Sequence, residues 1–406
     1  MKDFYLRYAD LAVKIGVNLQ KGQRLEIVCP TEREDFALIL AETAYKNGAK
    51  TVRINWENQK AERLDFTYAK KEDLCQIPKW LIEQKNALVE DNACYIYVDA
   101  EDPNAFLGLD EEKISDYITA KAKALKTYKD AVMSNGIRWC VISVPSKIWA
   151  DTVFNGEENS FEKLENAIAK CMRLETENYF DEWQNHIEKL SARAEFLNEK
   201  DFEYLHFESS NGTNLTVGLA DGHIWTSAME KAKDGVNFIA NMPTEEIFTS
   251  PHRLKVDGIV KNALPLALNG NIVDGFTIKF SKGEVVDFSA EKGYETLKRL
   301  IETDDGTKRI GEVALIGKNS PISKTGVLFY NTLFDENASC HLALGKAYPT
   351  TVKNGDKMSD KELLSAGLND SVEHIDFMFG TEDLTVTGIN KNGENTLLFT
   401  NGEWCI

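Results

Sequence analysis

The sequence predicts an α/β N-terminal domain with a parallel sheet, followed by a mainly antiparallel β (α+β) C-terminal domain. The chain has 406 residues, more than one hydrophobic core usually organises, so two domains are expected. Its first half alternates strand-like and helix-like segments, which is the pattern of a parallel sheet with crossover helices. Its second half consists mainly of short strand-like segments separated by Asn-Gly and Asp-Gly turn signals.

In the first half, the helix-like segments have apolar side chains at helical spacing, and the strand-like segments are rich in β-branched and aromatic residues. The expected helices span residues 4–17, 35–46, 79–89 and 111–134. The expected strands span residues 24–29, 50–56, 93–98 and 138–143. Cys29-Pro30-Thr31-Glu32 follows the first strand instead of a glycine-rich phosphate-binding motif. We therefore expect this domain to be a scaffold and not a nucleotide site.

A polar helical stretch at residues 161–197 is expected to bridge the two domains, which we place at residues 1–200 and 201–406. The strands expected after it span residues 204–207, 214–217, 254–260, 276–280 and 285–288. A helix is expected at residues 290–301. The turn signals that separate these strands are Asn211-Gly212, Asp221-Gly222, Asp257-Gly258 and Asn269-Gly270.

The composition indicates which classes of binding partner and which cellular compartment to expect. The net charge of −18, from 65 acids and 47 bases, disfavours a nucleic-acid partner because an acidic surface repels phosphate backbones. The absence of a secretory signal and of any apolar run of membrane-spanning length predicts a protein that is neither exported nor membrane-spanning. The seven cysteines form no C-x-x-C pair, which favours reduced thiols and the cytoplasm.

Two segments of the second half place carboxylates next to apolar residues. Glu245 and Glu246 are adjacent and come directly before an apolar pair. Glu312 lies in a buried-strand pattern, where alternation places it on the face of Ile310 and Ala314. A carboxylate on a buried strand is costly unless something neutralises it. The alternative for Glu312 is a solvent-exposed acid at the end of a strand.

Two histidines also stand beside carboxylates. Glu336 and His341 are five residues apart, about 140° out of phase on a straight helix. They converge only if Glu336 lies at or before the start of a helix; otherwise His341 is a core histidine. His374 and Asp376 are two residues apart in a strand-like run, so they point to the same side. An imidazole and a carboxylate on one strand face suit a metal ion.

The joint occurrence of these segments is more informative than any one of them. The chain has six histidines, and two of them lie beside carboxylates in apolar runs. The candidate ligands are one of the adjacent acids Glu245 and Glu246, together with Glu312, Glu336, His341, His374 and Asp376. Two imidazoles and four carboxylates form a mixed nitrogen and oxygen set sized for two divalent cations that share one acid. Zinc, cobalt, manganese or magnesium fit such a set better than metals that prefer thiolates.

At these segments the sequence resembles the thermophilic-type metallo-aminopeptidases, the family of aminopeptidase T, aminopeptidase S and PepS. The motifs are N-x-P-T-E-E-x-F-T, R-I-G-E-V-A-L, N-x-L-x-D-E-N-A-S-C-H-L-A-L-G and E-H-x-D-F-M-x-G, in the family's order. The resemblance covers essentially the whole chain and implies a homodimer with a C-terminal catalytic domain. It implies that all six candidates bind metal, with Glu312 as the bridge and Glu246 preferred to Glu245. It also implies that Tyr348 lies beside the metals.

The resemblance further implies a two-metal aminopeptidase, which removes the N-terminal residue from peptides with a free N-terminus through a metal-bridged water. Two cations about 3.5–4 Å apart lower the pKa of such a water. Glu312 and Tyr348 are the expected catalytic residues, with the Tyr348 hydroxyl donating to the oxyanion as it forms. Whether Glu312 or Glu336 accepts the proton of the water stays open. The alternatives are another dinuclear hydrolase, acting on amides or phosphoesters, and a non-catalytic metal-binding protein.

Overall fold

The structure is a computed structural model that describes residues 2–268 and 271–406. The chain divides into two compact units. Unit 1 comprises Met1–His186 and Met229–Thr244, and unit 2 comprises Ile187–Ala228 and Glu245–Ile406. The turn expected at Asn269-Gly270 lies outside the described residues.

Unit 1 contains a five-stranded parallel sheet with the order β2-β1-β3-β4-β9. Its strands are β1 (Arg24–Pro30), β2 (Thr51–Glu57), β3 (Cys94–Asp99), β4 (Trp139–Ser143) and β9 (Asn241–Met242). The first four strands are the four predicted from the sequence. The fifth comes from residues far along the chain, and Met242 pairs in register with Ile142. The same segment forms a small hairpin from β7 (Glu230–Lys231) and β8 (Asn237–Phe238).

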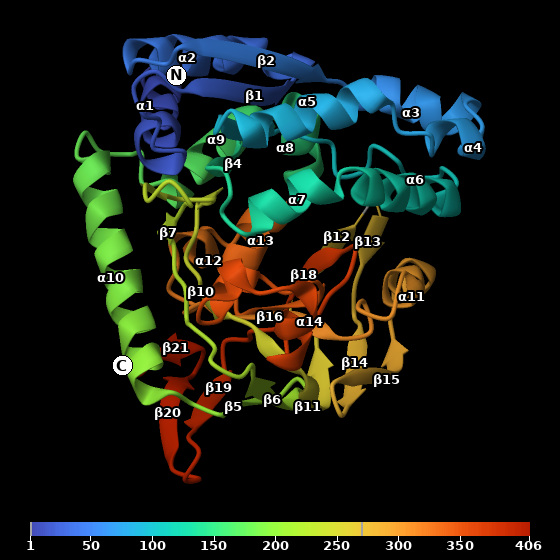
Figure 1. The fold of residues 1–406 in the computed structure, drawn as a ribbon, viewed down its shortest axis with the longest axis vertical. Coiled ribbons are helices and arrows are strands. Elements are labelled where there is room, and N and C mark those ends of the chain that lie inside the picture. The colour runs from blue at the N-terminus through green and yellow to red at the C-terminus, as the bar shows by residue number, and fades with distance from the viewer. Residues whose placement is uncertain (1, 269–270) are drawn as a thin grey trace. The chain divides into compact units, whose positions relative to one another are not determined.

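Helices connect the strands of this sheet, as predicted for a parallel sheet. They are α1 (Lys2–Leu11), α2 (Glu34–Lys46), α3 (Gln59–Tyr68), α4 (Lys71–Leu74), α5 (Lys79–Glu90), α6 (Glu111–Ala124), α7 (Lys126–Met133), α8 (Lys147–Val153) and α9 (Ser160–Cys171). Short turns follow α1 (Ala12–Gly16) and β1 (Thr31–Arg33). Figure 1 shows α1 beside α2, and α5 near α7.

Unit 2 contains two antiparallel sheets. The smaller has the order β10-β16-β17-β18, with strands β10 (Ile247–Thr249), β16 (Ile310–Leu315), β17 (His341–Gly345) and β18 (His374–Met378). The larger has the order β15-β14-β11-β6-β5-β19-β20-β21. Its strands are β5 (Tyr204–Glu208), β6 (Asn214–Leu219), β11 (Pro251–Lys261), β14 (Thr277–Ser281), β15 (Glu284–Ser289), β19 (Thr385–Ile389), β20 (Asn395–Thr400) and β21 (Glu403–Trp404). In a separate two-stranded sheet, β12 (Leu266–Leu268) pairs with β13 (Asn271–Val273) in antiparallel orientation.

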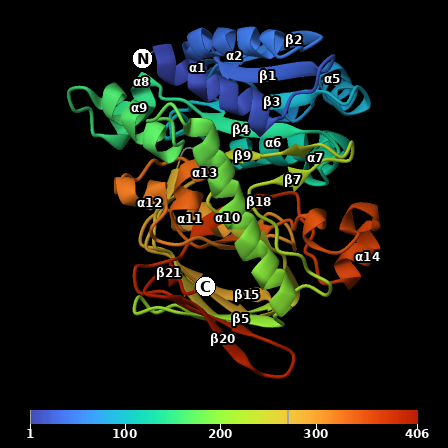
Figure 2. The same ribbon diagram turned by 90° about the vertical axis from the view of Figure 1, so that its left-hand side faces the viewer.

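The two sheets of unit 2 share one hydrophobic core. Val217, Val256 and Val386 of the larger sheet belong to the same buried cluster as Val313 and Leu342 of the smaller one. Figure 2 shows strands β5 and β15 in a layer separate from β18. The helices of this unit are α11 (Tyr294–Glu302), α12 (Pro321–Thr325), α13 (Thr332–Asp335) and α14 (Asp360–Ser365), with short turns at Glu336–Ala338, Pro349–Thr351 and Gly355–Lys357. The predicted fold class, α/β followed by mainly antiparallel β, is confirmed.

Two long predicted helices are interrupted. The helix predicted at residues 111–134 divides at Leu125 into α6 and α7. The stretch predicted at 161–197 divides into α9 and α10 (Tyr179–Lys200), because the chain leaves the helical conformation after Met172, where Arg173 has a φ of +54°. The first boundary between the units, at His186/Ile187, falls within helix α10, and the chain passes between the units again at Ala228/Met229 and Thr244/Glu245. No helix of the described chain is long and apolar enough to cross a membrane.

Candidate metal centre

The smaller sheet of unit 2 has one apolar face and one face that carries ionisable groups. Val313, Leu342 and Phe377 belong to the core that the two sheets share. The opposite face carries Glu312 on β16, His341 on β17, and His374 with Asp376 on β18. In the pairing of the strands, Ala343 lies opposite both Glu312 and Asp376, and Gly345 lies opposite His374. These two small residues leave space above the middle strand for a bound ion.

A β-bulge in β16 corrects one part of the sequence interpretation. Alternation placed Glu312 on the face of Ile310, but Ile310 packs in the core with Val313. The pairing shifts between Ile310 and Glu312, so that one extra residue, Gly311, is inserted in this strand. A β-carbon on Gly311 would collide with the backbone oxygens of Gly345 and Lys346. The bulge therefore requires glycine at this position and turns Glu312 to the face of the ionisable groups.

His341 lies at the centre of the group and is almost wholly buried. Its Nε2 atom lies 3.2 Å from Glu246 Oε2, 3.5 Å from Glu312 Oε1 and 3.8 Å from Asp376 Oδ1. His374 is a second centre, with Nε2 3.4 Å from Glu312 Oε2 and 3.5 Å from Asp376 Oδ1. The two oxygens of Glu312 thus face different imidazoles.

Backbone carbonyls fix the orientation of both imidazole rings. The Nδ1 atom of His341 lies 2.9 Å from the carbonyl oxygen of Glu336, and that of His374 lies 2.6 Å from the carbonyl oxygen of Lys346. A carbonyl oxygen only accepts hydrogen bonds, so each Nδ1 carries a proton and donates it. In the neutral ring the lone pair is then on Nε2, which faces the carboxylates. This is the arrangement that metal-binding histidines usually have.

Glu336 reaches the group by a route that the sequence did not predict. It lies in the short turn Glu336–Ala338 after α13, and His341 begins strand β17, so no helix carries both. Burial raises the pKa of the Glu336 carboxyl well above its ordinary value, and Asp376 and Glu246 add to that effect. The carboxylate of Glu336 therefore interacts with the other acids, although it lies outside the two tightest groups of ligand atoms described below.

Asn337 links two of the predicted ligands, and sequence reasoning missed it. Its side chain is fully buried, and its Oδ1 accepts a hydrogen bond from the backbone N–H of Glu245 at 2.7 Å. Its Nδ2 donates to the carbonyl of Leu333 at 2.9 Å and to Glu336 Oε1 at 3.4 Å. Asn337 thereby holds the segment of Glu246 next to the turn of Glu336. The only sequence signal was an amide in an otherwise apolar and acidic segment.

The adjacent acids Glu245 and Glu246 have different surroundings. Glu246 directly precedes β10, and its carboxylate lies 3.2 Å from His341 Nε2, while Phe248 of β10 packs with Ala314 and Tyr348. Glu245 interacts electrostatically with Arg193 of α10. Of the two acids, Glu246 is therefore the one that belongs to a candidate ligand group with His341.

Tyr348 lies beside the ionisable groups. Its ring makes an edge contact with the His374 ring at a centroid distance of 4.9 Å, and a second one with Phe248 at 5.8 Å. The ring is half-buried. A tyrosine in this position can present its hydroxyl to a molecule bound at the face.

Cys340 is the thiol next to His341 in the sequence, but it points elsewhere. Its Sγ lies 3.4 Å from both the backbone nitrogen and the backbone oxygen of Ile316. Burial raises the pKa of this thiol to about 12. Because the thiolate is the reactive form, Cys340 is a structural residue and not a nucleophile.

The charges of the group are those of a site for cations. Burial alone would lower the pKa of His341, but Glu246, Glu312 and Asp376 outweigh it and raise that pKa well above its usual value. Burial also raises the pKa of Glu246, with Glu312 and Asp376 contributing. The Asp376 Oδ1 atom is buried and has no hydrogen-bond partner. A buried carboxylate oxygen of this kind is expected where a metal ion completes its coordination.

Two sets of ligand atoms are close enough to hold one ion each. The first is Glu246, Glu312 and His341, and the second is Glu312, His374 and Asp376; within each set the ligand atoms lie within 4.8 Å of one another. Glu312 belongs to both. The donor chemistry of imidazole nitrogen with carboxylate oxygen fits divalent cations such as zinc, cobalt or manganese.

Comparison with known proteins identifies the family. Residues 2–404 match the family model of the thermophilic metalloproteases (M29). The chain belongs to this family. The M29 relatives include Aminopeptidase 2 of Geobacillus stearothermophilus, 42% identical over 98% of this chain and 97% of that protein. Aminopeptidase AmpS of Bacillus subtilis is 41% identical over the same shares.

The three-dimensional comparison agrees with the sequence comparison. The structure of wild-type AmpT from Thermus thermophilus covers 100% of both chains with a TM-score of 0.92 at 37% identity. The resemblance inferred from the four motifs is confirmed, and so is the prediction of an enzyme of a metalloprotease family. The M29 match also makes divalent metal ions the expected cofactors.

Proposed function

We propose that this M29 chain is a two-metal aminopeptidase, with its active site on the ionisable face of the smaller sheet of unit 2. The observation that carries the proposal is the pair of three-residue ligand groups that share Glu312. A structural metal site is usually closed by four ligands around one ion. Two open groups with a common carboxylate instead suit two ions that act together on one substrate.

The proposal assigns a role to each predicted residue. Glu246 and His341 bind one ion, His374 and Asp376 bind the other, and Glu312 bridges the two. Glu336 supplies a further carboxylate at the same face. The two ions together supply Lewis acidity and lower the pKa of a water nucleophile. Four carboxylates balance the charge of two divalent cations, which accounts for so many acids in a buried site.

The preference for a free N-terminus rests on the relatives and on the acids of the site. The relatives named above are aminopeptidases. A substrate's α-amine needs a metal ion or a carboxylate to recognise it, and the proposed site offers both kinds of group. We also propose a cytoplasmic homodimer. The location is supported by the seven free cysteines, and the dimer by the resemblance to the family.

The decisive experiment compares one peptide with a free and with an acetylated N-terminus. We expect the enzyme to release the first residue of the free peptide and to leave the acetylated peptide and a phosphoester chromogen uncut. Dialysis against a chelator should abolish the cleavage, and added cobalt or zinc should restore it. Equal turnover of both peptides would indicate an endopeptidase, and full activity in metal-free protein would exclude the two-metal proposal.

Tyr348→Phe tests the role of the hydroxyl next to His374. The substitution keeps the ring and its contacts with Phe248 and His374, so metal content and Tm are expected to stay near those of the wild type. Loss of one preorganised donor to the oxyanion should lower kcat by about 10²–10³-fold, while KM changes much less. Steady-state kinetics and metal analysis on the same preparation give both values. Near-normal kcat, or loss of metal, would show that Tyr348 has another role.

A further inference from the structure

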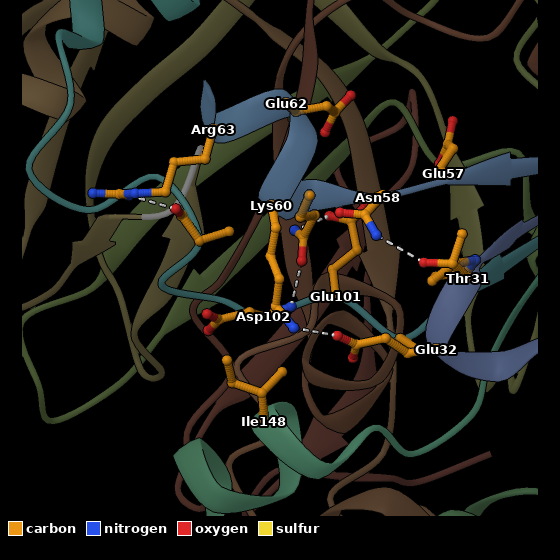
Figure 3. A pocket seen from close by; sticks show the side chains of 14 residues that line it. Thr31, Glu32, Glu57, Asn58, Lys60, Glu62, Arg63, Glu101, Asp102 and Ile148 are labelled. Atoms are coloured by element: carbon orange, nitrogen blue, oxygen red, sulfur yellow. Dashed lines mark hydrogen bonds and ion pairs between the residues drawn. The ribbon is translucent and has the colours of Figure 1, made fainter. Parts of the chain in front are cut away.

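A cavity lies in unit 1, at the carboxyl ends of its parallel strands. It has a volume of about 120 Å³ and is formed by residues at and after the ends of β1, β2 and β3, including the first turns of α3, together with Ile148 of α8. In the sheet order β2-β1-β3-β4, β2 lies on one side of β1 and β3 on the other, so the chain changes direction across the sheet after β2. In open α/β sheets, ligands bind outside the carboxyl ends of the strands at such a switch point. Figure 3 shows the side chains around this cavity.

The charged side chains around the cavity are mostly acidic. Five carboxylates line it, from Glu32, Glu57, Glu62, Glu101 and Asp102, against two bases. Both bases are engaged with groups of the chain. The Lys60 amine lies 2.8 Å from Glu32 Oε1, and Arg63 donates a 2.6 Å hydrogen bond to the carbonyl of Ala105 (Figure 3). Lys60 is thus paired with Glu32, whereas Arg63 keeps its charge beside a neutral carbonyl, and the five acids still outnumber the two bases of the lining.

Glu101 is held in place at the base of the cavity. The Tyr97 hydroxyl donates to one of its oxygens at 2.8 Å, and the Gln59 amide donates to the other at 3.0 Å. Burial raises the pKa of this carboxyl to about 8, and Asp99, Glu57 and Glu62 contribute in the same direction. Burial likewise raises the pKa of Glu62, with Glu57 adding to the effect and Lys121 opposing it in part. These carboxylates thus repel one another across the cavity, and a bound cation would reduce that repulsion.

The spacing of the carboxylates and the apolar part of the lining indicate whether the cavity suits a metal ion or an organic cation. Among the described residues, the three-residue groups close enough for one metal ion are both at the candidate metal centre, so these acids are too far apart to coordinate a metal ion together. Pro30, Ala100 and Ile148 give the cavity an apolar wall. Its volume has room for roughly four water molecules or a small ligand of similar bulk.

We propose that this cavity binds a small organic cation, with an ammonium or guanidinium group at Glu57, Glu62 and Glu101 and an apolar portion against Pro30 and Ile148. The cation can be a free amine or a basic side chain of a peptide, because both have the same charged group. This site is independent of the metal centre, whose ligands all belong to unit 2.

The test uses n-butylammonium as the probe and butyrate as a control of equal size and opposite charge. Binding to the metal-loaded full chain is measured by ligand-observed NMR at pH 9, where Glu101 is ionised and the amine is still protonated. We expect n-butylammonium to bind with a Kd on the order of 1 mM and butyrate not to bind. Glu101→Gln should weaken binding by about tenfold or more. Glu34→Gln, which removes an exposed acid of α2 outside the cavity, should leave it unchanged.

A steric variant separates charge from shape. Ala105→Leu keeps every charge but fills the cavity, so it should also abolish binding. The proposal is wrong if Glu101→Gln and the wild type bind the amine equally, if butyrate binds as well as the amine, or if Ala105→Leu retains binding. A peptide blocked at both ends with one central lysine identifies the source of the cation: competition with n-butylammonium supports a peptide side chain, and its absence with intact amine binding supports a free amine.

Discussion

Glu312→Gln is expected to expel at least one metal ion per chain and to reduce the turnover of aminoacyl substrates by about 10³-fold or more. The physical reason is the position of Glu312 in both ligand groups. One of its oxygens faces His341 and the other faces His374. Removal of its charge therefore weakens the binding of both ions and leaves the repulsion between them uncompensated. Metal analysis after gel filtration and steady-state kinetics give the two readouts.

Glu245→Gln is the matched control for that variant. It removes an acid of the same type one residue from Glu246, but the side chain interacts with Arg193 and belongs to neither ligand group. Metal content should stay at the wild-type value. If Glu245→Gln loses metal while Glu246→Gln does not, the assignment of the two acids is reversed. If Glu312→Gln keeps both ions and its rate, Glu312 is not the bridge.

Ala343→Leu is expected to prevent metal binding without removing any ligand. Ala343 is fully buried and lies opposite both Glu312 and Asp376 in the sheet. A leucine there would project into the space where the two carboxylates meet. We expect fewer than two ions per chain and loss of activity, together with a destabilisation of about 1–3 kcal/mol from overpacking.

Leu342→Met provides the control on the neighbouring residue, which faces the shared core. This volume-conserving change should cost less than about 1.5 kcal/mol and leave the metal content unchanged. Thermal unfolding of the metal-free forms separates the packing effect from the effect of metal. Two tightly bound ions in folded Ala343→Leu would show that the small residue is not needed for the site.

The sequence was sufficient for those features that depend on short-range patterns. The four N-terminal strands, five strands of unit 2 (β5, β6, β11, β14 and β15) and the common side of His374 and Asp376 follow from alternation and turn signals. The clustering of the six candidate ligands was predicted from their types and from the family resemblance. In the structure, five of them lie within 4 Å of another candidate ligand. Glu336 is close enough for the other acids to affect its pKa.

Features that depend on long-range pairing could not be predicted in this way. Alternation placed Ile310 on the same face as Glu312, but the bulge at Gly311 puts them on opposite faces. The glycine that the bulge needs is set by the backbone of Gly345 and Lys346, about 35 residues further along the chain. The role of Asn337 likewise depends on the position of Glu245, which is distant in sequence. A local pattern holds no information on which backbone will approach a glycine or an amide.

The strand β9 has a consequence for the order in which the chain folds during synthesis. The fourth strand of the parallel sheet ends at Ser143, whereas the fifth begins at Asn241, after the first strands of unit 2 have been translated. At about 5–20 residues per second, a ribosome delivers the fifth strand roughly 5–20 s after the fourth. During that interval β4 is the uncovered edge of the nascent sheet. A fragment that stops at the end of α9 would keep this edge permanently, so we expect it to aggregate where the full chain does not.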